Sequence, residues 1–89
     1  MEWDDGIAES NSSKHGLDFK DAQEVFAGLT VSVMDDRFDY DERRFITLGM
    51  LKDVVVVIAH TETDRVIRVI SMRKATKNEQ ETYFKGLTN

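Results

Sequence analysis

The segment that decides the fold reads Arg65-Val66-Ile67-Arg68-Val69-Ile70-Ser71-Met72-Arg73-Lys74-Ala75-Thr76. It has the pattern of a β-strand over residues 65–73 that carries arginines and runs directly into a C-terminal helix. An arginine on a strand is costly to order unless it meets an anion, because its planar fork of five donors suits carboxylate or phosphate. The segment therefore indicates either a site for a phosphate backbone or a surface that docks an acidic partner.

Three more strands are predicted upstream, over residues 29–34, 43–49 and 53–61. The stretch 53–61 is almost continuously apolar, which is typical of a central strand that is covered on both faces. Tight connections at 50–52 and 62–64 make successive strands antiparallel. Residues 35–42 are mostly acidic, which predicts a surface loop.

Helices are predicted before and after the strands. Asp4 has the position of an N-cap for a helix over about residues 5–15, and Gly16 is its expected left-handed stop. Asp18 is expected to cap a second helix that ends at Gly28. The apolar stripe of this second helix should face the core. It comprises Phe19, Ala22, Val25, Phe26 and Leu29.

The last helix is predicted from a capping box in which Thr76 and Glu79 satisfy each other's backbone N–H groups. The expected order is α-α-β-β-β-β-α. We therefore predict an α+β fold, a small single domain over residues 1–89 with two N-terminal helices, a four-stranded antiparallel sheet and a C-terminal helix.

Charge is distributed unevenly along the chain, which has 89 residues, a net charge of −5 and no cysteine. Residues 1–64 carry six Lys and Arg against fifteen Asp and Glu, whereas residues 65–89 carry six against two. The acidic total argues against indiscriminate nucleic-acid binding, but a local basic site remains compatible with it. The absence of cysteine excludes disulfides, thiolate metal sites and thiol nucleophiles.

The longest apolar run, residues 54–59, falls far short of the roughly 20 residues that span a bilayer. The acidic N-terminus also lacks the basic and then apolar pattern of a signal peptide. We therefore expect no membrane partner and a cytoplasmic location.

An ordered set of motifs resembles the BrnT toxin family of bacterial type II toxin–antitoxin systems. The motifs are Asn11-x-x-Lys14-His15-Gly16, Phe19 with Ala22 and Val25-Phe26, Glu42-Arg43-Arg44-Phe45 closing on Gly49, and Arg68-Val69-Ile70-Ser71-Met72-Arg73-Lys74-Ala75 with Glu79 and Tyr83. The family usually has Ser-Ala-Arg where this chain has Ser71-Met72-Arg73.

The resemblance implies a RelE-like ribonuclease toxin that cleaves RNA, inhibits growth and is neutralised by a BrnA-type antitoxin. Such an antitoxin binds operator DNA, so the toxin itself would contact that DNA only indirectly. The resemblance therefore implies an endoribonuclease with an RNA substrate and a protein partner.

Arg68 and Arg73 are the leading candidates for phosphate binding. In an ideal strand their side chains point to opposite faces, because five positions separate them. They can line one cleft only if the strand is bulged or ends near Ser71. The structural alternative for Arg68 is an ion pair with a neighbouring acid.

Candidates for proton transfer are Lys14, His15, Glu42 and His60. Metal-independent RNA cleavage needs a base for the 2′-hydroxyl, cations for the developing phosphorane charge and an acid for the leaving 5′-oxygen. Lys14 and His15 also suit the C-terminal end of a helix dipole. His60 alternates with apolar residues, so a half-buried sheet histidine is the alternative for that position.

Arg43, Arg44, Lys74 and Tyr83 complete the candidate substrate-binding residues. Glu42 and the two arginines can instead form surface ion pairs, and Tyr83 can pack on the sheet. The sequence contains no Gly-rich phosphate loop, Ser/His/Asp set or metal-ligand cluster, so we expect no metal and no other cofactor. The alternative function is a non-catalytic binding module whose arginine strand docks an acidic or helical partner.

Overall fold

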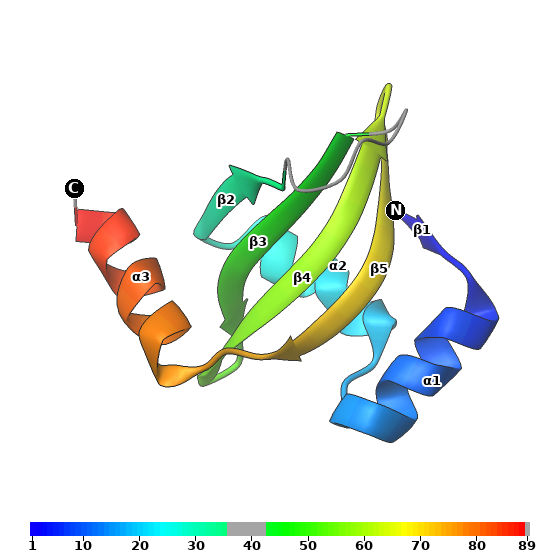
Figure 1. Ribbon diagram of the computed structural model, residues 1–89, viewed down its shortest axis with the longest axis horizontal. Coiled ribbons are helices and arrows are strands. Elements are labelled where there is room, and N and C mark those ends of the chain that lie inside the picture. Colours follow the sequence, from blue (N-terminus) through cyan, green and yellow to red (C-terminus); the bar gives the residue numbers. More distant parts are fainter. Residues whose placement is uncertain (36–42, 89) are drawn as a thin grey trace.

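The computed structural model describes residues 1–35 and 43–88, in which three α-helices surround one five-stranded sheet of order β1-β5-β4-β3-β2 (Figure 1). The strands are β1 (Glu2–Trp3), β2 (Thr30–Met34), β3 (Arg43–Leu51), β4 (Val54–Thr63) and β5 (Val66–Lys74). The helices are α1 (Asp5–His15), α2 (Ala22–Ala27) and α3 (Lys77–Thr88), and a 3₁₀ turn, η1 (Phe19–Asp21), precedes α2.

The sheet is mixed, which corrects the predicted four antiparallel strands. The four long strands are antiparallel to their neighbours, but β1 adds a fifth strand that runs parallel to β5, with Glu2 opposite Arg68 and Trp3 opposite Val69. A strand of two residues carries no periodic pattern, so the sequence gives no sign of it. The α+β class and the three helices are confirmed.

The predicted helix ends match local hydrogen bonds. The Asp4 carboxylate accepts a hydrogen bond from the N–H of Ile7 at 3.0 Å, and Gly16 ends α1 with φ of 70°. The second helix differs from its prediction, because Asp18 caps η1 and the α-helical part starts only at Ala22. Leu29, placed on the buried stripe by periodicity, lies beyond α2 and is 71% exposed.

The hairpin turns are tighter than predicted. β3 continues to Leu51 and β4 continues to Thr63, so each turn contains only two residues, 52–53 and 64–65. Lys52 and Asp64 open these turns with positive φ values of 56° and 50°, which lets the chain reverse without extra residues. The strand β4 is the central strand of the sheet, as its apolar sequence predicted.

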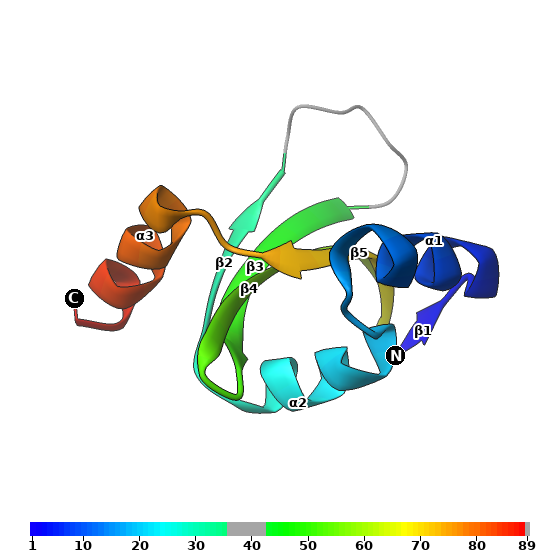
Figure 2. The ribbon, with the colours of Figure 1, turned by 90° about the horizontal axis from the view of Figure 1, so that it is seen from below.

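Two hydrophobic clusters cover opposite faces of the sheet. The larger lies under α2 and contains Phe19, Val25, Ile58 and Met72, with Trp3 packed against it. We call this side the α2 face. On the other side Tyr83 of α3 packs with a smaller cluster. Figure 2 shows α2 on one side of the curved sheet and α3 beside β2 at its edge.

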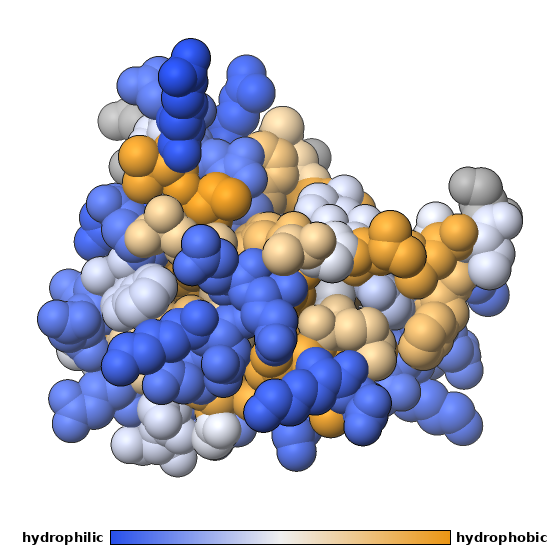
Figure 3. Space-filling view, turned by 180° about the vertical axis from the view of Figure 1, so that it is seen from behind, coloured by the Kyte–Doolittle hydropathy of each residue, from blue (hydrophilic) through white to orange (hydrophobic). Residues whose placement is uncertain are grey.

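The surface carries apolar residues in addition to the two clusters. Leu29, Phe84 and Leu87 are large apolar residues that remain exposed near β2 and on α3. Seen from behind, the surface is largely hydrophilic, and apolar residues gather toward the C-terminal end (Figure 3).

A β-bulge in β5 determines which of its side chains share a face. Ala59 pairs with Ser71 and His60 pairs with Val69, so Ile70 is the extra residue. An extra residue on one strand reverses the alternation of side chains beyond it. Val69 and Met72 therefore both join the cluster under α2, although three positions separate them.

Candidate functional site: an arginine-bearing sheet face

The bulge brings Arg68 and Arg73 to the same face of the sheet. Arg73 pairs with Val57 and Arg68 pairs with Thr61. Val57 and Thr61 are four residues apart on one regular strand, so they point to the same side. The sequence allowed a shared cleft only if the strand was bulged or ended near Ser71, and the structure shows the bulge, with β5 continuing to Lys74.

Arg44 joins this face from β3, because it also pairs with Thr61, from the opposite side to Arg68. Small side chains lie between the arginines: Ala59 and Ser71 pair with each other at the centre. We call this surface the arginine face. It comprises Arg44, Ala59, Thr61, Arg68, Ser71 and Arg73.

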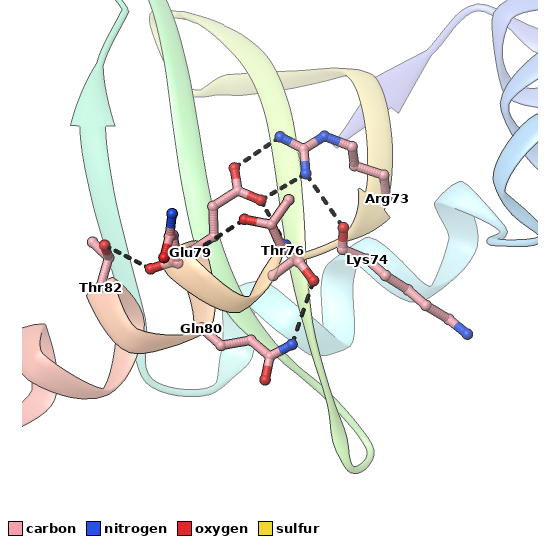
Figure 4. Close-up of polar contacts among 8 residues, drawn as sticks. Arg73, Lys74, Thr76, Glu79, Gln80 and Thr82 are labelled. Carbon is pink, nitrogen blue, oxygen red and sulfur yellow. Dashed lines mark hydrogen bonds and ion pairs between the residues drawn. The ribbon is translucent and has the colours of Figure 1, made fainter.

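Arg73 is held by a carboxylate at the start of α3. Its Nη1 and Nη2 atoms each donate to one oxygen of Glu79 at 2.8 Å, and Nη1 also donates to the Lys74 carbonyl at 3.3 Å (Figure 4). The hydrogen bonds from Arg73 lower the pKa of Glu79 to about 2. The same hydrogen bonds raise the pKa of Arg73, so both groups are charged at neutral pH.

Arg68 is held more loosely. Its Nη1 atom lies 3.6 Å from a carboxylate oxygen of Glu2 on β1, and the two side chains are 50% and 56% exposed. An exposed pair at this distance contributes little to stability. Arg68 is therefore in an ion pair, as the structural alternative anticipated, but it remains open to solvent.

Two of the predicted substrate-binding residues lie off this face. Arg43 is exposed, but it alternates with Arg44 and therefore points to the α2 side of β3. Lys74 pairs with Val56, whose side chain lies in the cluster under α2, and its side chain points away from Arg73 in Figure 4. Alternation along a strand separates each from its neighbouring arginine.

Tyr83 has a structural position. It is 2% exposed, and its hydroxyl donates to the Leu29 carbonyl at 2.9 Å. Its ring also packs edge-on against that of Phe84, with 5.2 Å between the ring centroids. The ring is therefore packed on the sheet and is not available to stack on a base.

His60 lies on the α2 face, on the opposite side of the sheet from Arg68 and Arg73. It is 1% exposed, its ring stacks on that of Phe45, and the ring of Phe26 meets it edge-on. Its Nε2 atom lies 2.7 Å from the Thr47 hydroxyl, which in turn lies 2.7 Å from the Ser32 hydroxyl. Burial lowers the pKa of His60 to about 4, so the ring is neutral at physiological pH.

Lys14 and His15 occupy the last turn of α1. Neither makes a hydrogen bond or ion pair with Arg68 or Arg73. The structure holds α1 against β5 through Asn11, which was part of the family motif. Its Nδ2 atom donates to the Met72 carbonyl at 2.9 Å, and its Oδ1 atom accepts from the Met72 N–H at 3.1 Å.

The remaining candidates and cavities add little to this face. Glu42 lies outside the described residues. An open depression of about 470 Å³ is lined by residues of α1, among them Glu9 and Lys14, and includes no residue of the arginine face. Within residues 1–35 and 43–88, no three His, Asp or Glu side chains gather as metal ligands, and no helix is long and apolar enough to cross a membrane.

Glu79 is the important residue whose role sequence reasoning missed. The capping box predicted its bond to Thr76, and the structure confirms both reciprocal contacts, at 2.8 and 3.2 Å. The same box places a carboxylate just after the strand that carries Arg73. The closeness of Thr76 to the end of this strand was the signal that an Arg73–Glu79 pair would form.

The arginine face can bind anionic groups, because it presents the fixed guanidinium of Arg73 and the more exposed guanidinium of Arg68 beside small side chains. Comparison with curated proteins finds no match. A family described as "Ribonuclease toxin, BrnT, of type II toxin-antitoxin system" matches residues 3–79. Because this match covers most of the chain, the protein belongs to the BrnT family of ribonuclease toxins, which implies an antitoxin partner.

Proposed function

We propose that this protein is an endoribonuclease toxin that binds the RNA backbone on the arginine face and cleaves it without a metal ion. We further propose that it acts in the cytoplasm, that its cleavage of RNA inhibits growth, and that a BrnA-type antitoxin neutralises it. Family membership supports the ribonuclease class. The observation that carries the proposal is the bulge at Ile70, which gathers Arg68 and Arg73 on one face.

The chemistry assigned to these arginines is electrostatic. Cleavage by the 2′-hydroxyl concentrates negative charge on the phosphorane oxygens, and fixed cations lower the energy of that state. Arg73 is suited to this role because its partner Glu79 fixes it in place. Arg68 and Arg44 extend the positive surface along and across the strands.

Cleavage also requires a general acid or base that transfers a proton. The described residues of the arginine face include no histidine or carboxylate that could take this role. Lys14, His15 and Glu42 remain our candidates for this role. We leave His60 out, because it is buried on the α2 face and neutral at physiological pH. A histidine that gains a proton only below about pH 4 is a weak base. Because it also has no access to RNA, it is poorly suited to this reaction.

The direct test is cleavage of a labelled RNA in the presence of EDTA. We expect the wild type to cleave and Arg73→Ala to lose on the order of 100-fold in rate, the typical cost of removing one transition-state donor. Arg65→Ala is the matched control, because Arg65 lies in an exposed turn. Equal rates for Arg73→Ala and wild type would remove Arg73 from the mechanism.

A binding module without catalysis is the second candidate function. It is favoured by the two carboxylates that already pair with Arg68 and Arg73, since these contacts resemble those that an acidic partner would make. The same assay separates the two functions. Binding of RNA without cleavage by pure wild-type protein, or normal growth on overexpression without an antitoxin, would favour the binding module.

A further inference from the structure

Arg73 is bound along only one edge of its guanidinium group. The end formed by Nη1 and Nη2 faces Glu79, and Nη1 also contacts the Lys74 carbonyl. A guanidinium has a second donor edge, formed by Nε–H and the outer N–H of Nη2. Among the described residues, none accepts a hydrogen bond from Nε of Arg73. The side chain is 39% exposed.

Glu79 is itself fixed in position. Its Oε1 atom accepts a hydrogen bond from the N–H of Thr76, and its own N–H donates to the Thr76 hydroxyl. These contacts tie the carboxylate to the first turn of α3, and Tyr83 anchors that helix to the rest of the fold. A carboxylate on a rigid element can determine the orientation of the guanidinium that it binds.

We propose that Glu79 is a positioning residue, which holds one edge of the Arg73 guanidinium so that the other edge binds two oxygens of a backbone phosphate. This inference rests on the proposed function, because it assigns a task to Arg73 within the same site. The opposite reading is that Glu79 competes with phosphate for Arg73. When Glu79→Gln removes the negative charge, the affinity for phosphate should fall if Glu79 positions Arg73 and rise if Glu79 competes with phosphate.

Phosphate binding at Arg73 can be measured without any cleavage. We would follow the Nε–H signal of Arg73 by NMR while adding inorganic phosphate, and then a short RNA whose 2′-O-methyl groups prevent cleavage. Both ligands should shift this signal in the wild type. A shift with phosphate alone would indicate a simple anion site and overturn the assignment to RNA.

Substitution of Glu79 is the decisive step. Glu79→Gln places an amide donor against Nη2 and should weaken binding of both ligands about tenfold, the effect of losing one hydrogen bond between charged groups. Glu81→Gln is the matched control, since Glu81 is exposed on the same helix, and it should bind normally. Unchanged or tighter binding by Glu79→Gln would overturn the proposal.

A double substitution separates positioning from a purely structural effect. If Glu79 acts through Arg73, adding Glu79→Gln to Arg73→Ala should cause no further loss of RNA affinity or cleavage rate. An additional loss would show that Glu79 acts through the fold. Glu79→Asp keeps the charge but shortens the reach, and gives a folded comparison, checked by circular dichroism, if Glu79→Gln is unstable.

Cleavage of unmodified RNA distinguishes the two levels of the proposal. If phosphate and modified RNA bind as expected but no variant cleaves, the ribonuclease assignment fails and the positioning role stands. If the wild type cleaves RNA while Glu79→Gln retains full affinity and rate, the positioning role fails and the ribonuclease assignment stands.

Discussion

The two faces of the sheet are built from the same strands and have opposite chemistry. The α2 face buries His60, keeps it neutral and surrounds it with aromatic rings. The arginine face leaves Arg68 and Arg73 partly exposed and charged. One extra residue, Ile70, decides which side chains go to which face. The placement of titratable side chains in this fold therefore depends on strand register more than on their number.

Placing an arginine at position 69 should have the largest effect. The bulge puts Val69 opposite His60, and Val69 is 1% exposed in the cluster under α2. A Val69→Arg variant would therefore place its guanidinium in that cluster, whereas Arg68, one position earlier, stays at the surface. Burial of an unpaired guanidinium should destabilise the fold by at least about 3 kcal/mol. Urea unfolding followed by circular dichroism would measure the change.

The control is Val66→Arg, because Val66 is 39% exposed on the same strand. This variant should keep the stability of the wild type and retain RNA binding. If Val69→Arg were as stable as wild type, the bulge would not be the feature that separates the two faces.

Acid should weaken the α2 face in a defined pH range. The pKa of His60 is about 4 in the folded protein against an ordinary value of 6.5, so the unfolded chain binds a proton that the folded chain excludes between these values. The free energy of unfolding should be constant with respect to His60 above pH 6.5. It should then fall as the pH drops toward about 4, by roughly 3 kcal/mol in total.

Urea titrations at several pH values would measure this slope. His60→Gln should flatten it, whereas His15→Gln should leave it unchanged because His15 lies outside the buried network. The exposed Glu62 carboxylate, 3.6 Å from Nδ1 of His60, would reduce the slope if it paired with the protonated ring. An unaltered slope in His60→Gln would assign the acid sensitivity to other groups.

Glu2→Gln should have the smallest effect. The Glu2–Arg68 pair is about half exposed on both sides, so its loss should change the free energy of unfolding by less than about 0.5 kcal/mol. RNA affinity should stay equal or rise slightly, because an acidic group is removed beside Arg68. A fall in RNA affinity, measured by fluorescence anisotropy, would give Glu2 a positioning role similar to that proposed for Glu79.

Local signals predicted most of the fold. Asp4, Gly16 and the Thr76–Glu79 box each mark a helix end by contacts within a few residues, and the apolar run of β4 marks the central strand. The sequence did not reveal β1, because its pairing depends on a strand about 65 residues away. Long-range pairing of so short a segment leaves no periodic trace.

The candidate site was harder to predict for the same reason. The arginines of β5 were visible, but alternation alone placed them on opposite faces, and only the pairing of β5 with β4 shows the bulge. Arg43 and Arg44 look equivalent in sequence, but as neighbours on one strand they point to opposite faces of the sheet. A site on a sheet is defined by register, which depends on partner strands and not on composition.

The side chain of Asn11 has a consequence for assembly. It bonds both the N–H and the C=O of Met72, which are groups that a neighbouring strand would otherwise use, while β1 occupies the adjacent positions at Arg68 and Val69. A sheet can extend continuously from one copy of the protein to the next only if each molecule has two sheet edges free to pair. The β5 edge is occupied by the Asn11 amide and by β1. Two copies that pair through their β2 edges would therefore form a dimer that cannot add a third copy.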